Sequence, residues 1–127
     1  MKKMSRYILI VEDNSINARL MSEYLKRKGI EYVIAPDGET AVEEVKNKLD
    51  ISLVLMDIGL PFMSGEEAME EIKKIRPDLP VIAQTAYTYA DSEEQYILAG
   101  FDDYLAKPIN FHSLDKLLVK YDYVSIF

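Results

Sequence analysis

The chain has 127 residues, the usual size of one domain, so we expect residues 1–127 to share one hydrophobic core. Hydrophobic residues make up 49% of the sequence and charged residues 29%, which excludes disordered and low-complexity classes. Acidic residues outnumber basic ones by 22 to 15, giving a net charge of −7. Because no basic cluster is large enough to follow a phosphate backbone, we expect no direct nucleic-acid partner.

The absence of cysteine excludes disulfide frameworks, thiolate metal sites and cysteine nucleophiles. The longest uncharged window, residues 79–90, is too short to span a bilayer, and the first residues do not lead into an apolar secretory signal. We therefore expect a cytoplasmic domain that makes no membrane contact.

Short apolar runs alternate with segments of helical spacing. In chain order, the predicted elements are a strand at 7–11, a helix over 20–25, a strand at 32–35, a helix over 41–49, a strand at 53–56, a helix over 68–75, a strand at 81–83, a helix over 91–100, a strand at 104–106 and a helix over 114–121. The runs are continuously apolar, which is typical of strands buried on both faces of a parallel sheet. The fourth helix is the least well defined: Asp91 and Glu94 could form its capping box, and its apolar face is only Tyr96, Ile97 and Leu98.

This alternation predicts an α/β fold. With right-handed crossovers, five strand and helix pairs give a parallel sheet covered by helices on both faces. Ligands of such open sheets bind outside the carboxyl ends of the strands. The residues just after each apolar run are therefore the first candidates for a functional site.

Polar residues with matching chemistry stand at four of these positions. Glu12 and Asp13 follow the first run, Asp57 the third, Thr85 the fourth and Lys107 the fifth. Three neighbouring carboxylates need a cation among them, and oxygen ligands favour Mg²⁺ or Mn²⁺ over zinc. Since Mg²⁺ often shares its shell with phosphate, and an aspartate can form an acyl phosphate, we expect Asp57 to accept a phosphoryl group. Lys107 and Thr85 would then contact the phosphate oxygens.

A wider set of motifs runs through nearly the whole chain in order: Glu12-Asp13-Asn14, Met56-Asp57, Pro61, Gly65, Thr85-Ala86, residues 100–104 and Lys107-Pro108. Together they resemble the receiver domain of two-component response regulators. Residues 11–17, 84–87 and 106–109 are most similar to the receiver modules of hybrid sensor histidine kinases. The resemblance implies a flavodoxin-like, doubly wound sheet with strand order 2-1-3-4-5.

The resemblance also implies a role for each acidic residue. Asp57 matches the phosphoacceptor, which receives its phosphoryl group from a histidine kinase or a histidine phosphotransfer protein. Asp13 matches a direct metal ligand and Glu12 a companion that acts through water. Gly59 stands where a backbone carbonyl completes the metal shell.

Thr85 and Tyr104 match the pair of residues that moves on phosphorylation, and Lys107 matches the phosphate-contacting lysine. The Lys107–Pro108 bond is expected to be cis, as is usual in this family. The resemblance implies that phosphorylation changes the surface of the fourth helix, fifth strand and fifth helix, which could also form a homodimer.

Each motif also has a plainer interpretation. Glu12, Asp13 and Asn14 could simply cap the first helix, Asp57 could form a turn, and Lys107 could be a solvated surface lysine. Their joint position at four strand ends favours the phosphoacceptor interpretation.

Two other functions use similar residues. A hydrolase of the haloacid dehalogenase type needs a second aspartate two residues after the nucleophile, where this chain has Gly59. A flavin-binding module of the same sheet order needs a phosphate-cradling loop, but the glycines here are scattered. We therefore expect a signalling domain that assists its own phosphorylation and dephosphorylation, not an enzyme that acts on a metabolite.

Overall fold

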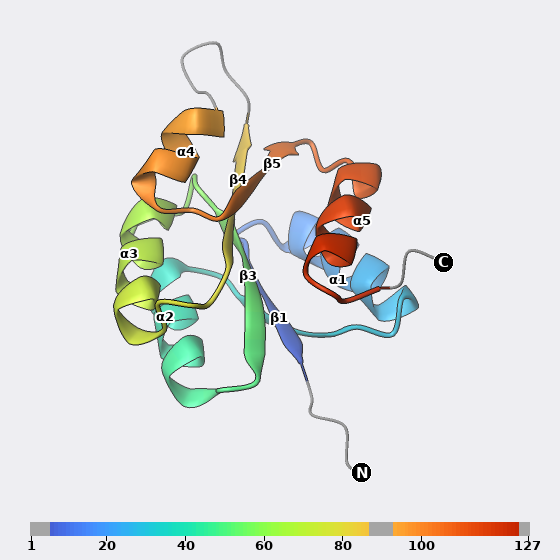
Figure 1. Cartoon of the computed structure of the whole chain (residues 1–127), viewed down its shortest axis with the longest axis horizontal. Helices are drawn as coiled ribbons and strands as arrows, with labels where there is room; N and C mark the ends of the chain where they lie inside the picture. Colours follow the sequence, from blue (N-terminus) through green and yellow to red (C-terminus); the bar gives the residue numbers. More distant parts are fainter. Residues whose placement is uncertain (1–5, 87–92, 125–127) are drawn as a thin grey trace.

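The computed structural model describes residues 6–86 and 93–124, which form one parallel sheet with helices on both faces (Figure 1). The strand order is β2-β1-β3-β4-β5, which confirms the predicted fold class and topology. The strands are β1 (Tyr7–Val11), β2 (Glu31–Ala35), β3 (Ile51–Asp57), β4 (Val81–Ala86) and β5 (Asp103–Lys107). The helices are α1 (Ser15–Arg27), α2 (Gly38–Asn47), α3 (Gly65–Ile75), α4 (Glu93–Ala99) and α5 (Phe111–Lys120). Within the described ranges, no helix has the length and apolar character needed to cross a membrane.

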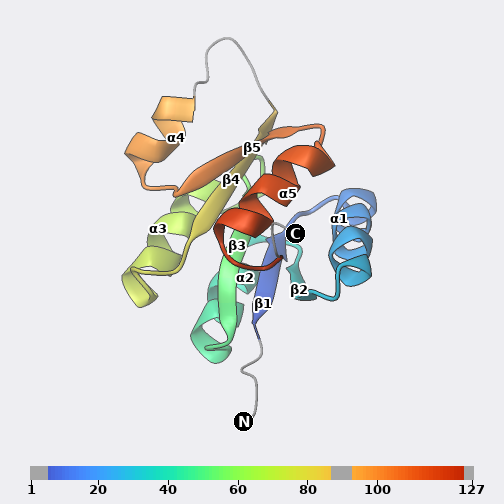
Figure 2. The ribbon, with the colours of Figure 1, turned by 45° about the vertical axis from the view of Figure 1, so that its right-hand side comes forward.

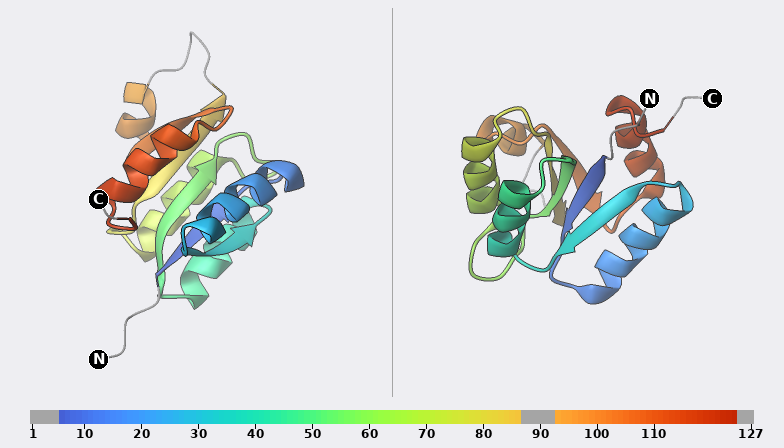
Figure 3. Two further views of the ribbon diagram at one scale, coloured as in Figure 1. Left: turned by 90° about the vertical axis from the view of Figure 1, so that its right-hand side faces the viewer. Right: turned by 90° about the horizontal axis from the view of Figure 1, so that it is seen from below.

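The hydrophobic core has two halves, one on each face of the sheet. Helices α1 and α5 pack on one face, and α2, α3 and α4 on the other (Figure 3). Successive strand residues point to opposite faces, so Ile8 and Ile10 join the first half and Leu9 and Val11 the second. The central strands are therefore buried on both faces, as their apolar runs predict.

The edge strand β2 departs from that prediction. Only Ala35 is fully buried in it, and Ile34 is 41% exposed. β2 pairs with β1 alone, so one of its sides has no neighbouring strand. A continuous apolar run does not distinguish a central strand from an edge strand that is partly covered by helices.

Polar side chains cap four of the helices at the carboxyl edge of the sheet. Asn14 Oδ1 accepts from the N–H of Asn17 at 2.9 Å, and Asp37 caps α2 in the same way. Ser64 forms a capping box at the start of α3, and Asn110 caps α5. The predicted start of α4, Asp91, lies outside the described residues.

Several residues assigned to apolar helical faces are instead exposed, namely Leu20, Leu49, Ile75, Ile97 and Leu98. Leu20 in α1 is 54% exposed, because the buried face of that helix is formed by Ala18, Met21, Ser22 and Leu25. Leu49 is 80% exposed because α2 ends at Asn47, before the residue that would continue its apolar stripe. Met21, Met56 and Met69 are buried and fill the core.

Figure 2 shows α5 lying across the sheet, and hydrogen bonds join the segment after this helix to the residue before β1. The guanidinium of Arg6 donates to the carbonyls of Tyr121 and Asp122, both at 2.8 Å. Farther along, the hydroxyl of Tyr123 hydrogen-bonds Ser52 near the start of β3. Both ends of the fold therefore lie opposite the edge where the polar strand-end residues gather.

Candidate functional site

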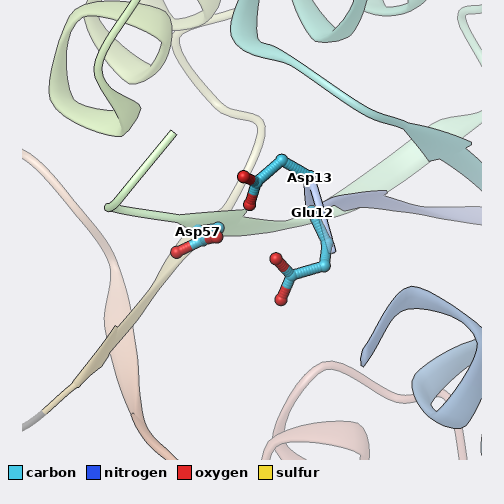
Figure 4. A group of neighbouring side chains, drawn as sticks. All are labelled: Glu12, Asp13 and Asp57. Atoms are coloured by element: carbon cyan, nitrogen blue, oxygen red, sulfur yellow. The ribbon is translucent and has the colours of Figure 1, made fainter. Parts of the chain in front are cut away.

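Glu12, Asp13 and Asp57 come together at the carboxyl edge of the sheet (Figure 4). One carboxylate oxygen from each residue lies within 4.8 Å of the other two. Glu12 is 2% exposed and Asp57 5%, whereas Asp13 is exposed to solvent. The structure thus brings together the three acids that the sequence places after β1 and at the end of β3.

Lys107 joins the two buried acids. Its Nζ lies 3.0 Å from Asp57 Oδ1 and 3.1 Å from Glu12 Oε1. The side chain is 22% exposed, so this lysine is a largely buried ion-pair partner and not a solvated surface residue.

Burial and the neighbouring Asp57 carboxylate together raise the pKa of Glu12 to about 7, although the Lys107 amine acts to lower it. Burial also acts to raise the pKa of Asp57, but hydrogen bonds from Glu12, Lys107 and the Gly59 N–H outweigh it and hold that pKa below its usual range. Near neutral pH, Asp57 is therefore the acid of this pair that stays ionised, while Glu12 takes up a proton more easily.

The loop after β3 fixes the position of Asp57. The Gly59 N–H donates to Asp57 Oδ1 at 3.0 Å. A Cβ atom on Gly65 would lie 2.4 Å from the backbone oxygen of Asp57 and 2.9 Å from Ile58 Cα. The start of α3 can approach the end of β3 this closely only because residue 65 has no side chain. The Gly59 carbonyl was assigned to the metal by resemblance, and that role stays a prediction.

The helix-cap interpretation is correct for Asn14 but not for Glu12. Asn14 caps α1 through its side chain. Glu12 turns inward, where it pairs with Lys107 and accepts from the Asn14 N–H at 3.3 Å.

Thr85 lies near the end of β4 and is 5% exposed. It follows Gln84, which pairs with Asp57 in the sheet register. Its Oγ1 lies 2.9 Å from the hydroxyl of Tyr96 in α4. The sequence placed Tyr96 on an apolar helix face; a hydrogen bond to Thr85 is not visible in the spacing, because it depends on how α4 sits against the sheet.

Tyr104 lies in β5, and its half-buried side chain packs against the core half formed with α2, α3 and α4. The Lys107–Pro108 bond is cis, as predicted. Beside the acids, a pocket of about 230 Å³ opens between α1 and the loop after β5; its lining comprises Glu12, Asn17, Leu20, Lys107, Pro108, Ile109 and Phe111.

Comparison with known proteins identifies the family. Residues 8–119 match the response regulator receiver domain. The chain belongs to the response regulator receiver family. Hybrid signal transduction histidine kinase I of Dictyostelium discoideum is 38% identical to this receiver over 111 residues, which cover 81% of this chain and 6% of that kinase. The chain spans between 7% and 28% of other curated relatives, so those relatives contain further parts.

Two solved receiver domains have closely similar folds. One belongs to the sensor histidine kinase PA1611 of Pseudomonas aeruginosa and holds a magnesium ion in its active-site cleft; its TM-score is 0.82 at 31% identity, covering 94% of this chain and 99% of that one. The other, Ssk1 of Saccharomyces cerevisiae, was crystallised with the histidine phosphotransfer protein Ypd1; its TM-score is 0.82 at 30% identity, covering 95% of this chain and 91% of that one. The predicted resemblance to receivers, including those of sensor kinases, is confirmed.

The acidic cluster of this receiver has the chemistry to hold a hard divalent cation. Its three carboxylates offer oxygen ligands close enough to share one ion. Burial and the neighbouring Asp57 carboxylate raise the pKa of Glu12, so it is costly to keep all three acids ionised, and a bound cation would lower that cost.

Proposed function

We propose that residues 1–127 form a single receiver domain in which Asp57 accepts a phosphoryl group from a phosphohistidine. One observation carries this proposal: the ionised Asp57 is buried between two further acids, with the Lys107 amine 3.0 Å from its Oδ1. This arrangement supplies a nucleophile, a cation-binding cluster and a fixed positive charge at one point. It supports a role in signalling and not in the conversion of a metabolite.

The transfer requires one bond to form and one to break. A carboxylate oxygen of Asp57 attacks phosphorus, the histidine N–P bond breaks, and its electron pair returns to the imidazole nitrogen. Lys107 Nζ lies close enough to Asp57 to contact the oxygens of the new phosphoryl group and offset their negative charge. In the reverse direction of the switch, water would attack phosphorus at the same site, the bond between Asp57 oxygen and phosphorus would break, and inorganic phosphate would leave the free aspartate behind.

Glu12, Asp13 and Asp57 would hold Mg²⁺ or Mn²⁺, with Glu12 acting through water and the Gly59 carbonyl completing the shell. A bound divalent cation supplies charge neutralisation, which allows an anionic phosphoryl group to approach three acids. The magnesium ion in the PA1611 receiver supports this assignment.

The pocket beside Lys107 suits a donor that approaches from the α1 side. Its rim carries Leu20, 54% exposed, and Phe111, 36% exposed, and Ile16 on the same helix as Leu20 is 70% exposed. Apolar side chains beside a charged centre are typical of protein docking surfaces. The Ssk1 complex with Ypd1 supports a histidine phosphotransfer protein as the donor, with a histidine kinase as the alternative.

Movement of Thr85 and Tyr104 on phosphorylation would change the surface made by α4, β5 and α5. The phosphorylated domain could form a homodimer through that surface. The expected cytoplasmic location stays a prediction.

Intact-protein mass spectrometry tests the acceptor. With acetyl phosphate and Mg²⁺, the wild type should gain the mass of one phosphoryl group; EDTA should abolish the gain. Asp57→Asn, which keeps the shape of the side chain, should gain none. Equal labelling of Asp57→Asn and the wild type would refute the assignment of Asp57.

A further inference from the structure

Tyr96 anchors α4. Of residues 94–99, the part of this helix whose side chains are described, Tyr96 alone is buried. It is 6% exposed, whereas Ile97 and Leu98 are 42% and 86% exposed. Its ring also meets Phe101 edge to face, with centroids 6.2 Å apart. A movement of the Tyr96 ring therefore changes how α4 sits on the sheet.

The hydroxyl of this anchor is bonded to Thr85. The two oxygens are 2.9 Å apart and buried. The Thr85 hydroxyl also faces the Ala86 carbonyl, at a longer distance of 3.4 Å. Of these two hydrogen bonds of the Thr85 hydroxyl, the one with Tyr96 is therefore the shorter. It joins the end of β4 to α4.

A phosphoryl group on Asp57 would compete for the same hydroxyl. Either oxygen can be the donor in the Thr85–Tyr96 bond, so the competition is for the position of Thr85 Oγ1. Anionic phosphoryl oxygens attract a hydroxyl hydrogen more strongly than a neutral oxygen does, and turning Thr85 toward them would take Oγ1 away from the Tyr96 hydroxyl. Thr85 lies one residue beyond Gln84, the register partner of Asp57, so its side chain stands at the correct edge of the sheet to make the exchange.

We infer that Tyr96 is a positioning residue that holds Thr85 in the unphosphorylated arrangement, and that phosphorylation exchanges the Thr85–Tyr96 hydrogen bond for one from Thr85 to the phosphoryl group. The inference rests on the proposed function of Asp57. The exchange leaves a buried tyrosine hydroxyl without its threonine partner, which favours movement of the ring and of α4 with it. Because binding and conformation are linked, the Thr85–Tyr96 bond must oppose phosphoryl binding to the extent that it stabilises the unphosphorylated form.

Tyr96→Phe removes the hydroxyl and keeps the ring that packs on Phe101. Its affinity for beryllofluoride, a phosphoryl analogue, should be measured by fluorine NMR titration in Mg²⁺. We expect the variant to bind about 3- to 10-fold more tightly than the wild type, the range that one net hydrogen bond supplies. Tyr7→Phe is the matched control, because Tyr7 begins β1 at the opposite edge of the sheet, and its affinity should equal that of the wild type.

A double-mutant cycle separates this role from a general structural one. Thr85→Val removes the competing hydroxyl, so adding Tyr96→Phe to Thr85→Val should leave the affinity unchanged. Unchanged or weaker binding by Tyr96→Phe alone, or the same gain in the Thr85→Val background, would overturn the inference. If wild-type protein fails to bind beryllofluoride, or Asp57→Asn binds it equally well, the proposed function itself fails.

Discussion

Lys107 reaches Asp57 across an intervening strand: β4 lies between β5 and β3, yet Nζ and Oδ1 are 3.0 Å apart. The amine also contacts Glu12, at 3.1 Å, and thus links three strands of the sheet at one edge. Within the described residues, no other ion pair reaches these two acids. The positive charge of Lys107 therefore offsets part of the negative charge of the acidic cluster.

Lys107→Met should slow phosphorylation by acetyl phosphate about 100-fold, because a positioned donor to the developing charge is lost. Initial labelling rates at saturating Mg²⁺, followed by mass spectrometry, measure the effect. Mg²⁺ affinity should stay the same or increase, since no acidic ligand is removed. Lys120→Met is the matched control: this lysine pairs with Asp103 at 2.7 Å, away from the acids, so its labelling rate should not change.

Gly65→Ala should lower the free energy of unfolding by about 1 to 3 kcal/mol, the cost of forcing atoms into a packed space. The added Cβ would lie 2.4 Å from the Asp57 backbone oxygen, so either α3 or the end of β3 must shift. Gly59→Ala is the control, because its Cβ would meet only Asp57 Oδ1, at 3.8 Å. Urea unfolding of both variants measures the difference; equal stability would show that α3 can withdraw from β3 without cost.

Gln84→Met should raise the free energy of unfolding by about 1 kcal/mol. Gln84 is 0% exposed, and both polar atoms of its amide lack a hydrogen-bond partner among the described residues. Methionine fills a similar volume without polar atoms to satisfy. Gln95→Met, at an exposed position of α4, should change stability by less than about 0.5 kcal/mol. A loss of stability in Gln84→Met would instead show that a buried water serves the amide.

Asp37 should give part of the stability of the fold a pH dependence. Its carboxylate caps α2, and hydrogen bonds from the Thr40 backbone N–H and hydroxyl hold its pKa below the usual range. A carboxyl whose pKa is lower in the folded state stabilises the fold above its unfolded pKa of about 4, and the contribution is lost as pH falls through the folded pKa.

Asp37→Ala should cost about 1 kcal/mol at pH 7, whereas Asp37→Asn, which can still cap, should cost less. The wild-type advantage over Asp37→Asn should stay constant from pH 7 to about 5 and shrink below about 4. Urea unfolding across that range measures it. A constant advantage down to pH 2 would mean that the carboxylate charge contributes nothing.

The sequence was sufficient to predict where the acids and Lys107 meet, because the carboxyl ends of parallel strands always share one edge. It could not show that Glu12 turns inward while Asn14 caps α1, since both residue types favour helix starts. The difference comes from the position of Lys107 on β5, which supplies a buried partner for Glu12.

Exposure at the edges of the fold was also beyond the sequence. Ile34 and Leu20 belong to apolar patterns that are buried elsewhere in the chain. Ile34 is exposed because β2 is an edge strand, and Leu20 is exposed because it lies on the face of α1 that points away from the sheet. The Thr85–Tyr96 bond is of the same kind, because it joins two elements whose relative placement is decided by packing.

The contact of Arg6 with the carbonyls of Tyr121 and Asp122 bears on the design of fusion proteins and sensors that contain this domain. A fluorescent protein or affinity handle joined directly before Arg6 or directly after Val124 would start at the edge opposite Glu12 and Asp57. Because Arg6 contacts Tyr121 and Asp122, a copy cut back to residues 6–124 could also be spliced into a surface loop of a host protein without stretching that loop. A sensor made in this way would leave the acidic edge open to its donor.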